Sequence, residues 1–269
     1  MRIYLMLYLD RIKSVYRFVL FFKRIPNLIS PKRFTDFLLL KRIKWGPRSS
    51  FEIETADKYL LRSYVKNKLG DAYLPQLFGA FNSGNDIDFE KLNYPCVIKS
   101  NHGSGHVEIL KSCPENKKDL VNKLNKWLSQ EFPHWYRFIN PKLICEEYLV
   151  DDKKDQPLED FKFFVFNGAA TFIEVDVDRF NGHKRSMYTR DWDLIEVIYN
   201  YPIGPKIEKP LHLEKMIKIA EALSNKKDFV RVDLYSSGEK IIVGELTHSP
   251  DAARMPFNPD SFDFEMYAK

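Results

Sequence analysis

The segment 161–177 constrains the fold of this chain more than any other. Its two arms are rich in Phe, Val and Ile, and they flank the dipeptide Asn167-Gly168. Asn-Gly is the preferred pair for a type I′ turn, because both residues tolerate the positive φ angles that this turn requires. The segment therefore predicts a tight antiparallel β-hairpin. A second hairpin is predicted from the β-prone runs 229–235 and 241–247.

Apolar periodicity and helix-end signals predict the helices. Two helices are expected in the first 45 residues, separated near Pro26 and Pro31. A third is expected at 56–69, with Thr55 as its N-cap and Gly70 at its end. Two further helices are expected at 115–130 and 213–224.

The remaining regular segments are short strand candidates. They lie at 76–81, 96–100, 107–111 and 142–150, and the last twenty residues are predicted to be irregular. Strands that group in hairpins, without regular alternation with helices, are typical of an α+β fold with mainly antiparallel sheets. A length of 269 residues allows one large domain or two small ones.

Basic residues are concentrated at the N-terminus. Residues 1–45 contain eleven Lys or Arg and two Asp, a net charge of +9, whereas the whole chain carries +5. No motif of a nucleic-acid-binding fold accompanies this asymmetry, so nucleic acid is not a predicted partner.

Residues 1–25 are predicted to form an amphipathic helix. Charged residues interrupt its apolar run and no small-residue cleavage site follows, which argues against a signal sequence and against a membrane span. Two interpretations stay open: the helix packs on its own domain, or it lies on an anionic surface such as the inner membrane face. On a helical wheel five charged residues share an arc of roughly 80°: Arg2, Asp10, Lys13, Arg17 and Arg24.

The three cysteines, Cys96, Cys113 and Cys145, are odd in number and lack the CxxC spacing of zinc sites. Two of them lie in apolar runs. We expect buried, reduced thiols, as in a cytoplasmic protein, and no zinc site.

The second hairpin contains two acidic residues at matching positions. Asp233 and Glu245 lie six residues either side of Glu239, so a loop centred there would place them opposite each other and pair Arg231 with Thr247. Like charges directly opposite destabilise a sheet, which calls for a neutralising partner. Mg²⁺ fits, because it binds one or two carboxylates and completes its shell with phosphate and water. The alternatives are an exposed edge hairpin or a register that separates the two acids.

A lysine and a glycine-containing loop follow each other in the segment 95–110. Lys99 comes after an apolar Cys-Val-Ile run, and Gly103, Ser104 and Gly105 follow it. Backbone N–H groups of such a loop can approach an anion closely, so lysine and loop together are suited to nucleotide phosphates. The pattern is not a Walker A motif. A glycine-containing hairpin with a lysine at the surface explains it equally well.

Other residues carry weaker signals. Glu146 and Glu147 end an apolar strand, and the backbone up to Leu149 could pair with an adenine edge, although such acids are usually solvated. Lys58 near a helix start and Lys162 between two Phe residues are unfavourably placed, so either a phosphate partner or solvent exposure would explain them.

A basic segment follows the first hairpin. It is predicted to be a loop that either grips an acidic sugar or an acyl phosphate through guanidinium groups, or is simply solvated. Its basic residues are Arg179, His183, Lys184 and Arg185.

Several of these segments, taken in order, resemble the TupA-like branch of the ATP-grasp superfamily over residues 55–250. The resemblance implies an α+β ATP-grasp fold with two α+β subdomains that grip ATP between antiparallel sheets. The implied division is a short helical region at 1–50 and subdomains at 51–150 and 151–269. The motifs are DKYLLRSYV, VIKSNHGSGH, EEYL, DFKFFVFNG, DVDRF, FVRVDLY and GELTHSP.

The resemblance also implies roles for individual residues. ATP and Mg²⁺ would be the cofactors. The phosphates would be held by Lys58 and Lys99 under a cover formed by Gly103, Ser104 and Gly105, with Lys162 nearby. The adenine and ribose would be lined by Glu146, Glu147 and Leu149, the metal would be ligated by Asp233 and Glu245, and Arg231 would stabilise the transferred phosphoryl group. Thr247 stands where many family members place an asparagine metal ligand.

The implied activity is an ATP- and Mg²⁺-dependent carboxylate–amine ligase. It would join an amino acid or other amine to a sugar or lipid-linked glycan carboxylate of a capsule or O-antigen intermediate, in the cytoplasm or at the inner membrane face. Arg179 and Arg185 are candidate contacts for the carboxylate or acyl phosphate. The alternatives are a sugar phosphotransferase on the same fold and a non-catalytic, membrane-peripheral glycan-binding protein.

Overall fold

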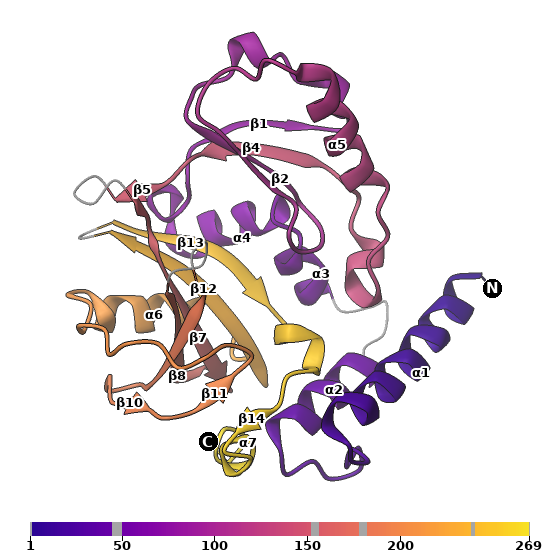
Figure 1. The fold of residues 1–269 in the computed structure, drawn as a ribbon, viewed down its shortest axis with the longest axis vertical. Helices are drawn as coiled ribbons and strands as arrows, with labels where there is room; N and C mark the ends of the chain where they lie inside the picture. The colour runs from indigo at the N-terminus through magenta and orange to yellow at the C-terminus, as the bar shows by residue number, and fades with distance from the viewer. Residues whose placement is uncertain (1, 45–49, 152–155, 178–181, 238–239, 269) are drawn as a thin grey trace. The chain divides into compact units, whose positions relative to one another are not determined.

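The computed structural model describes residues 2–44, 50–151, 156–177, 182–237 and 240–268 (Figure 1). The chain forms two compact units. Unit 1 consists of Met1–Gly46 and Glu159–Lys269, and unit 2 consists of Pro47–Leu158. The division at 1–50, 51–150 and 151–269 stays a prediction. Among the described residues, every helix is too short or too polar to span a bilayer.

Unit 1 is built on a six-stranded antiparallel sheet with the strand order β10-β9-β8-β7-β12-β13. Both predicted hairpins are present in it. Asn167 and Gly168 connect β7 to β8 with φ angles of 50° and 90°, as the type I′ prediction requires. The strands are β7 (Glu159–Phe166), β8 (Ala169–Val177), β9 (Lys184–Thr189), β10 (Leu194–Ile195), β12 (Phe229–Ser237) and β13 (Lys240–Thr247).

Helices cover both faces of this sheet. Helix α6 (Leu213–Leu223), predicted to within one residue, packs against β7, β8 and β12 on one face. The other face carries an aromatic cluster that includes Phe164, Phe172 and Phe229. Burial of this cluster stabilises unit 1, because each fully buried Phe contributes about 1.5–3 kcal/mol.

The two N-terminal helices pack on the aromatic cluster. Phe18 of α1 (Arg2–Phe22) and Phe34 of α2 (Phe34–Lys44) are both fully buried in it. The connection between the helices is held by Arg24, whose Nη1 lies 2.6 Å from Asp36 Oδ1. The predicted two-helix start is therefore confirmed, and one face of α1 packs on its own unit.

Unit 2 contains a four-stranded antiparallel sheet with the order β1-β4-β2-β3. Helix α5 (Lys117–Ser129) covers it, with Leu124 and Trp127 buried against Ile98 and Cys145. The strands are β1 (Leu77–Phe81), β2 (Cys96–Ser100), β3 (Val107–Leu110) and β4 (Leu143–Glu147).

The helix predicted at 56–69 is wrong in its first turn. Two helices occupy this region, α3 (Ser50–Ala56) and α4 (Leu60–Leu69). Thr55 lies inside α3, where its hydroxyl donates to the Phe51 carbonyl, so it is not an N-cap. Asp57 takes the capping role instead, because its Oδ1 accepts from the backbone N–H groups that begin α4. Gly70 ends α4 with a φ of 95°, as predicted.

Two regions expected to be irregular contain regular structure. Lys184 and Arg185 begin strand β9, so the predicted basic loop is wrong from this point on. The last twenty residues include α7 (Ser261–Glu265) and β14 (Phe257–Asn258). The remaining short elements are β5 (Val150–Asp151), β6 (Gln156–Pro157), β11 (Ile198–Tyr199) and the 3₁₀ turns Asp71–Tyr73, Gly84–Asp86, Phe89–Lys91, His134–Phe138 and Pro250–Ala253.

All three cysteines are free thiols, as expected. Cys96 and Cys145 are buried on adjacent strands, and Cys113 is half-buried. Burial raises the pKa of the Cys96 thiol.

We expect Phe34→Ala to lower the free energy of unfolding by about 3–5 kcal/mol, because it removes a ring that contacts Phe164, Phe166 and Phe229. Urea unfolding at equilibrium measures this loss. Leu211→Ala is the control, since Leu211 is an exposed residue and its truncation should change stability by less than about 0.5 kcal/mol. Similar losses for the two variants would contradict the described core.

Candidate functional site

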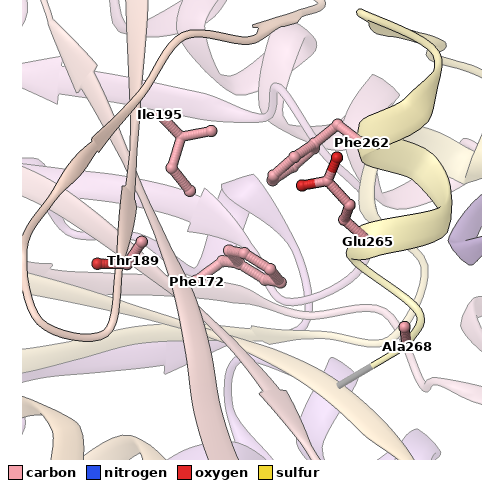
Figure 2. Close-up of a pocket in the computed structure, with 6 residues that line it drawn as sticks. All are labelled: Phe172, Thr189, Ile195, Phe262, Glu265 and Ala268. Carbon is pink, nitrogen blue, oxygen red and sulfur yellow. The ribbon is translucent and has the colours of Figure 1, made fainter.

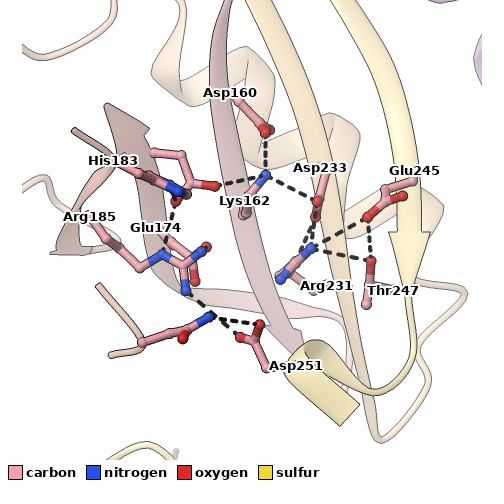
Figure 3. A network of polar contacts seen from close by, with 12 residues as sticks. Asp160, Lys162, Glu174, His183, Arg185, Arg231, Asp233, Glu245, Thr247 and Asp251 are labelled. Carbon is pink, nitrogen blue, oxygen red and sulfur yellow. Dashed lines mark hydrogen bonds and ion pairs between the residues drawn. The ribbon is translucent and has the colours of Figure 1, made fainter. Parts of the chain in front are cut away.

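Ionised side chains occupy one end of the sheet face in unit 1 that carries the aromatic cluster. Along β7, the even positions run from Asp160 and Lys162 to Phe164, so the face changes from charged to aromatic within five residues. The same change occurs on the neighbouring strands. The charged members of this network are Asp160, Lys162, Glu174, Asp176, Arg185, Arg231, Asp233, Glu245 and Asp251 (Figure 3).

The predicted pairing of Asp233 with Glu245 is confirmed, and Arg231 pairs with Thr247 as expected. The predicted reason is wrong. Near the turn, Ser237 pairs with Lys240, so the pairing there is not centred on Glu239. The register shifts between Asp233 and Leu234, and this bulge at Gly244 brings the two acids opposite each other.

The bulge position suits a glycine. A Cβ atom on Gly244 would lie 2.7 Å from the ring of Tyr235. A side chain there would therefore displace the Tyr235 ring, next to the point where the two carboxylates face each other.

Arg231 lies between the two paired acids (Figure 3). Its Nε and Nη2 donate to the two oxygens of Asp233, both at 2.7 Å. Its Nη2 is also 3.5 Å from Glu245 Oε1. Thr247 donates to the same Glu245 oxygen at 3.0 Å. The two carboxylates therefore converge on one guanidinium group, and Thr247 orients Glu245.

Lys162 joins this pair to the next strands. It is 4% exposed and lies on the face opposite Phe161 and Phe163, so the solvent-exposed interpretation is wrong. Its Nζ forms an ion pair with Asp160, and it lies 3.3 Å from Asp233 Oδ2 and 3.6 Å from Asp176 Oδ2.

Arg185 anchors the far side of the network. Its guanidinium contacts Asp176 Oδ1 at 2.9 Å and Glu174 Oε1 at 2.8 Å, and Asp251 lies 3.7 Å away. His183 Nε2 lies 2.9 Å from Asp176 Oδ1. Burial acts to raise the pKa of Asp176, but Arg185 and Lys162 outweigh it and hold that pKa below its usual value. Arg185 is thus a buried residue with protein partners, and its contact to substrate stays a prediction.

Burial and charge oppose each other in setting the pKa values of the network. Burial acts to lower the pKa of Lys162, but Asp233 and Asp160 raise it above its usual value, so the ammonium group stays charged. Burial raises the pKa of Asp233 against the effect of Arg231. Burial also raises the pKa of Glu174 to about 7.

The side chains of this network supply only some of the ligands that a Mg²⁺ ion needs. Within the residues that the structure describes, no three His, Cys, Asp or Glu side chains lie close enough to hold a metal. Asp233 and Glu245 supply hard carboxylate oxygens on one face, and Glu245 is 39% exposed. Two carboxylates are enough for Mg²⁺ when phosphate and water complete its shell, so the pair fits a metal that arrives with a nucleotide.

In unit 2, a second set of predicted residues lies on one face of the four-stranded sheet. Lys99 Nζ on β2 lies 2.6 Å from Glu146 Oε2 on β4. Glu146 is buried and also pairs with Arg62 of α4, so the expectation that this acid is solvated is wrong. Arg62 donates to the carbonyl of Pro75 at 2.8 Å. Glu146 therefore fixes the position of the Lys99 ammonium group.

Lys58 and the glycine-containing loop lie together. Lys58 Nζ donates to the Gly103 carbonyl at 2.9 Å, and the Lys58 N–H donates to the Asn101 carbonyl at 2.9 Å. Asn101 in turn donates to Asp57 at 3.0 Å. The predicted lysine and the predicted loop, 45 residues apart in sequence, are thus brought into contact.

Aromatic rings support the same loop. Gly103 has a φ of 76°, and a Cβ there would lie 2.2 Å from the ring of Phe132. The centroid of that ring lies 5.4 Å from those of His102 and His106, both in edge-to-face arrangements. His106 stacks on Trp127 with a centroid distance of 5.1 Å. Burial lowers the pKa of both histidines.

The structure shows fewer contacts for the remaining predicted residues that it describes. Glu147 Oε2 accepts from the Gln76 N–H at 3.3 Å, and Leu149 is half-buried. Ser104 and Gly105 are exposed in the loop. Arg179 lies outside the residues that the structure describes.

A separate pocket of about 350 Å³ lies in unit 1 (Figure 2). Its lining is mainly apolar and includes none of the residues predicted for the site. The lining residues are Phe172, Thr189, Ile195, Phe262, Glu265 and Ala268.

Sequence reasoning missed four carboxylates of the network, those of Asp160, Glu174, Asp176 and Asp251. Three of them lie at alternate positions of β7 and β8, on the face that Lys162 shares. This spacing was visible in the predicted hairpin, because side chains two residues apart share a face. The position of Asp251 had no such signal.

The family model described as TupA-like ATPgrasp matches residues 38–268. The chain belongs to the TupA-like ATP-grasp family. The α+β ATP-grasp fold is thereby confirmed, and membership implies ATP and Mg²⁺ as cofactors. The comparison with curated proteins finds no match.

One solved structure agrees with the family at the level of the fold. The chain is similar to an L-amino acid ligase from Bacillus licheniformis, with a TM-score of 0.53 and 15% identity over 87% of this chain and 53% of that one. It is also similar to D-alanine–D-alanine ligase from Bacillus anthracis, with a TM-score of 0.49 and 17% identity over 73% of this chain and 58% of that one. This TupA-like chain therefore spans a little over half the length of both.

We expect Gly103→Ala to destabilise the protein more than Gly105→Ala. Both residues have positive φ angles, 76° and 80°, so each alanine costs about 1–2 kcal/mol of backbone strain. Only the Cβ at Gly103 meets Phe132, whereas no atom lies within 4 Å at Gly105. Thermal unfolding measures the difference, and Phe132→Ala should reduce it. Equal effects of the two alanines would contradict the packing of the loop.

Acidification should destabilise unit 2 through His102 and His106. Their folded-state pKa values lie below the unfolded value of about 6.5, so the unfolded chain binds more protons below that pH. This stability is present above pH ~6.5 and is lost as the pH falls through the folded pKa. Urea unfolding at several pH values between 7.5 and 5.5 gives the free energy of unfolding as a function of pH. This free energy should fall less steeply with decreasing pH for His106→Gln than for the wild type. Identical slopes would rule out His106 as a contributor.

Proposed function

We propose that this chain is an ATP- and Mg²⁺-dependent carboxylate–amine ligase. The observation that carries the proposal is the pairing of Asp233 with Glu245 across β12 and β13, with Arg231 between them, in a member of the ATP-grasp family. Two carboxylates and a guanidinium group on one sheet face suit a metal-bound phosphoryl group, whose charge must be neutralised during transfer.

The proposed reaction has two steps. The substrate carboxylate takes the γ-phosphoryl group of ATP to give an acyl phosphate and ADP, and an amine then displaces phosphate to form the amide. Mg²⁺ would supply charge neutralisation at the phosphate oxygens. Asp233 and Glu245 would hold it, and Thr247 would keep Glu245 oriented through their hydrogen bond.

We assign the positively charged groups of unit 2 to the nucleotide. Lys99 is held at a fixed position by Glu146, and Lys58 is held at the loop by the Gly103 carbonyl. Both are therefore preorganised cations next to backbone that can approach an anion closely. Gly103, Ser104 and Gly105 would cover the phosphates, while Glu147 and Leu149 would lie near the adenine.

The roles of the other predicted cations follow from their surroundings. Arg231 would stabilise the transferred phosphoryl group, and Lys162 would hold Asp233 in place. Arg179 and Arg185 are the candidates for contact with the substrate carboxylate. Because Arg185 contacts Asp176 and Glu174, it would present to the substrate a guanidinium group that is already oriented.

For the substrates, we propose one of two pairs on a capsule or O-antigen intermediate: an amino acid or other amine with a uronic acid, or an amino acid with an amino sugar. A lipid-linked form of that sugar would place the reaction at the inner membrane face. The fold that this chain shares with an L-amino acid ligase is compatible with amide formation.

We expect Mg-ATP to raise the melting temperature of the wild-type protein, and Asp233→Asn and Lys99→Met to remove most of this shift. The expected loss in amine-dependent turnover is about 10²–10³-fold for Asp233→Asn, because a charge that stabilises the transition state is removed. Glu265→Gln, in the separate pocket of unit 1, is the control and should behave as the wild type.

Product analysis separates the alternatives. Amine-dependent release of both ADP and phosphate, together with a new amide, supports the ligase. A phosphorylated sugar without free phosphate would identify a phosphotransferase instead. A folded protein without any response to Mg-ATP would point to a glycan-binding protein, and would overturn the proposal.

A further inference from the structure

Helix α1 has a second apolar face that remains exposed. Leu7 and Phe18 are buried, and Phe18 packs in the aromatic cluster of unit 1. On a helical wheel drawn at ~100° per residue, an arc of roughly 120° lies beside the buried face. Seven of residues 5–22 fall in this arc, and all seven are apolar. Their side chains are between 36% and 63% exposed: Leu5, Tyr8, Leu9, Ile12, Tyr16, Val19 and Leu20.

We call these seven side chains the outer stripe. Isolated exposed apolar residues are common on soluble proteins, but a contiguous stripe of this size marks an interaction surface. A helix of 21 residues is about 30 Å long, so the stripe offers a straight contact surface. The inner face fixes α1 to the aromatic cluster, which means that the stripe is already formed before any partner binds.

Charge indicates what the partner is. Lys13 and Arg17 are exposed and lie about 20° and 60° beyond the edge of the stripe on the helical wheel. Lys23 follows at the C-terminal end of the helix and is exposed too. The outer stripe also contains Tyr8 and Tyr16, whose rings combine an apolar body with a polar end.

These features match an anionic lipid surface. An amphipathic helix that lies in the plane of a bilayer buries its apolar face to a depth of about 5–10 Å, with basic residues at its sides near the headgroups. On α1 the outer stripe is the apolar face, and Lys13 and Arg17 lie at its side.

We propose that the outer stripe of α1, together with Lys13 and Arg17, binds unit 1 to the surface of an anionic membrane. This proposal rests on α1 alone and does not require the ligase reaction. Lipid phosphate supplies the anions, and the acyl chains at the headgroup boundary take up the stripe.

Co-sedimentation of the full chain with vesicles tests the proposal. We expect binding to vesicles of phosphatidylcholine and phosphatidylglycerol (3:1), weaker binding to pure phosphatidylcholine, and weaker binding in 500 mM than in 50 mM NaCl. Each basic residue near an anionic surface contributes ~1 kcal/mol, so Lys13→Gln/Arg17→Gln should weaken binding about 30-fold. Leu9→Gln/Ile12→Gln should weaken it at least tenfold by removing buried apolar surface.

Matched controls lie elsewhere in the chain. Lys66→Gln/Lys68→Gln removes two exposed lysines from α4, and Ile198→Gln/Leu211→Gln removes two exposed apolar residues from unit 1. Both should bind vesicles as the wild type does. Circular dichroism and thermal unfolding show whether each variant is folded, independently of lipid binding and of nucleotide binding.

Three results would overturn the proposal. The first is a folded wild-type protein that does not sediment with anionic vesicles. The second is an equal loss of binding in the control variants. The third is a dimer in light scattering that Leu9→Gln/Ile12→Gln converts to a monomer without any vesicle binding by the wild type, which would make the outer stripe a contact between two copies.

Discussion

The bidentate pair between Arg231 and Asp233 is the interaction on which the charged network of unit 1 depends. Asp233 faces Glu245 across the hairpin and faces Lys162 on the other side, so its carboxylate is shared by two cations and opposed by one anion. Removing one partner of such a buried pair is strongly destabilising, whereas apolar residues in place of both are often tolerated. Stability alone therefore does not explain why the sheet face is charged. The proposed binding of an anionic ligand with a divalent cation would explain it, because such a ligand would exchange partners with groups that are already in position.

The parts of the fold that could be predicted are those with local causes. Asn167-Gly168 specifies its own turn, Gly70 ends a helix through its own φ angle, and α5 and α6 follow from apolar periodicity. The errors have distant causes. β9 is a strand because β8 offers it a partner, and the break between α3 and α4 depends on the buried side chain of Asp57, which also binds Asn101. Neither contact leaves a signal in the nearby sequence.

In the candidate site, too, contacts within one hairpin could be predicted, whereas contacts between distant elements could not. The pairing of Asp233 with Glu245 could be predicted because both residues lie in one hairpin, although the bulge at Gly244 that produces it was not anticipated. The contact of Lys58 with the glycine-containing loop was implied only by the family resemblance. The pairing of Arg62 and Lys99 with Glu146 could not be predicted at all, because these residues lie on three separate elements and their spacing carries no motif.

The discontinuity of unit 1 affects how the chain is made. Its N-terminal helices leave the ribosome before unit 2 does, yet Phe18 and Phe34 pack on strands that begin at residue 159, after the whole of unit 2. Throughout that interval the nascent polypeptide carries apolar helices without their sheet, and such surfaces aggregate or recruit chaperones. Unit 2, which is continuous, can fold during translation. Unit 1 must wait until the segment that begins at residue 159 has been synthesised.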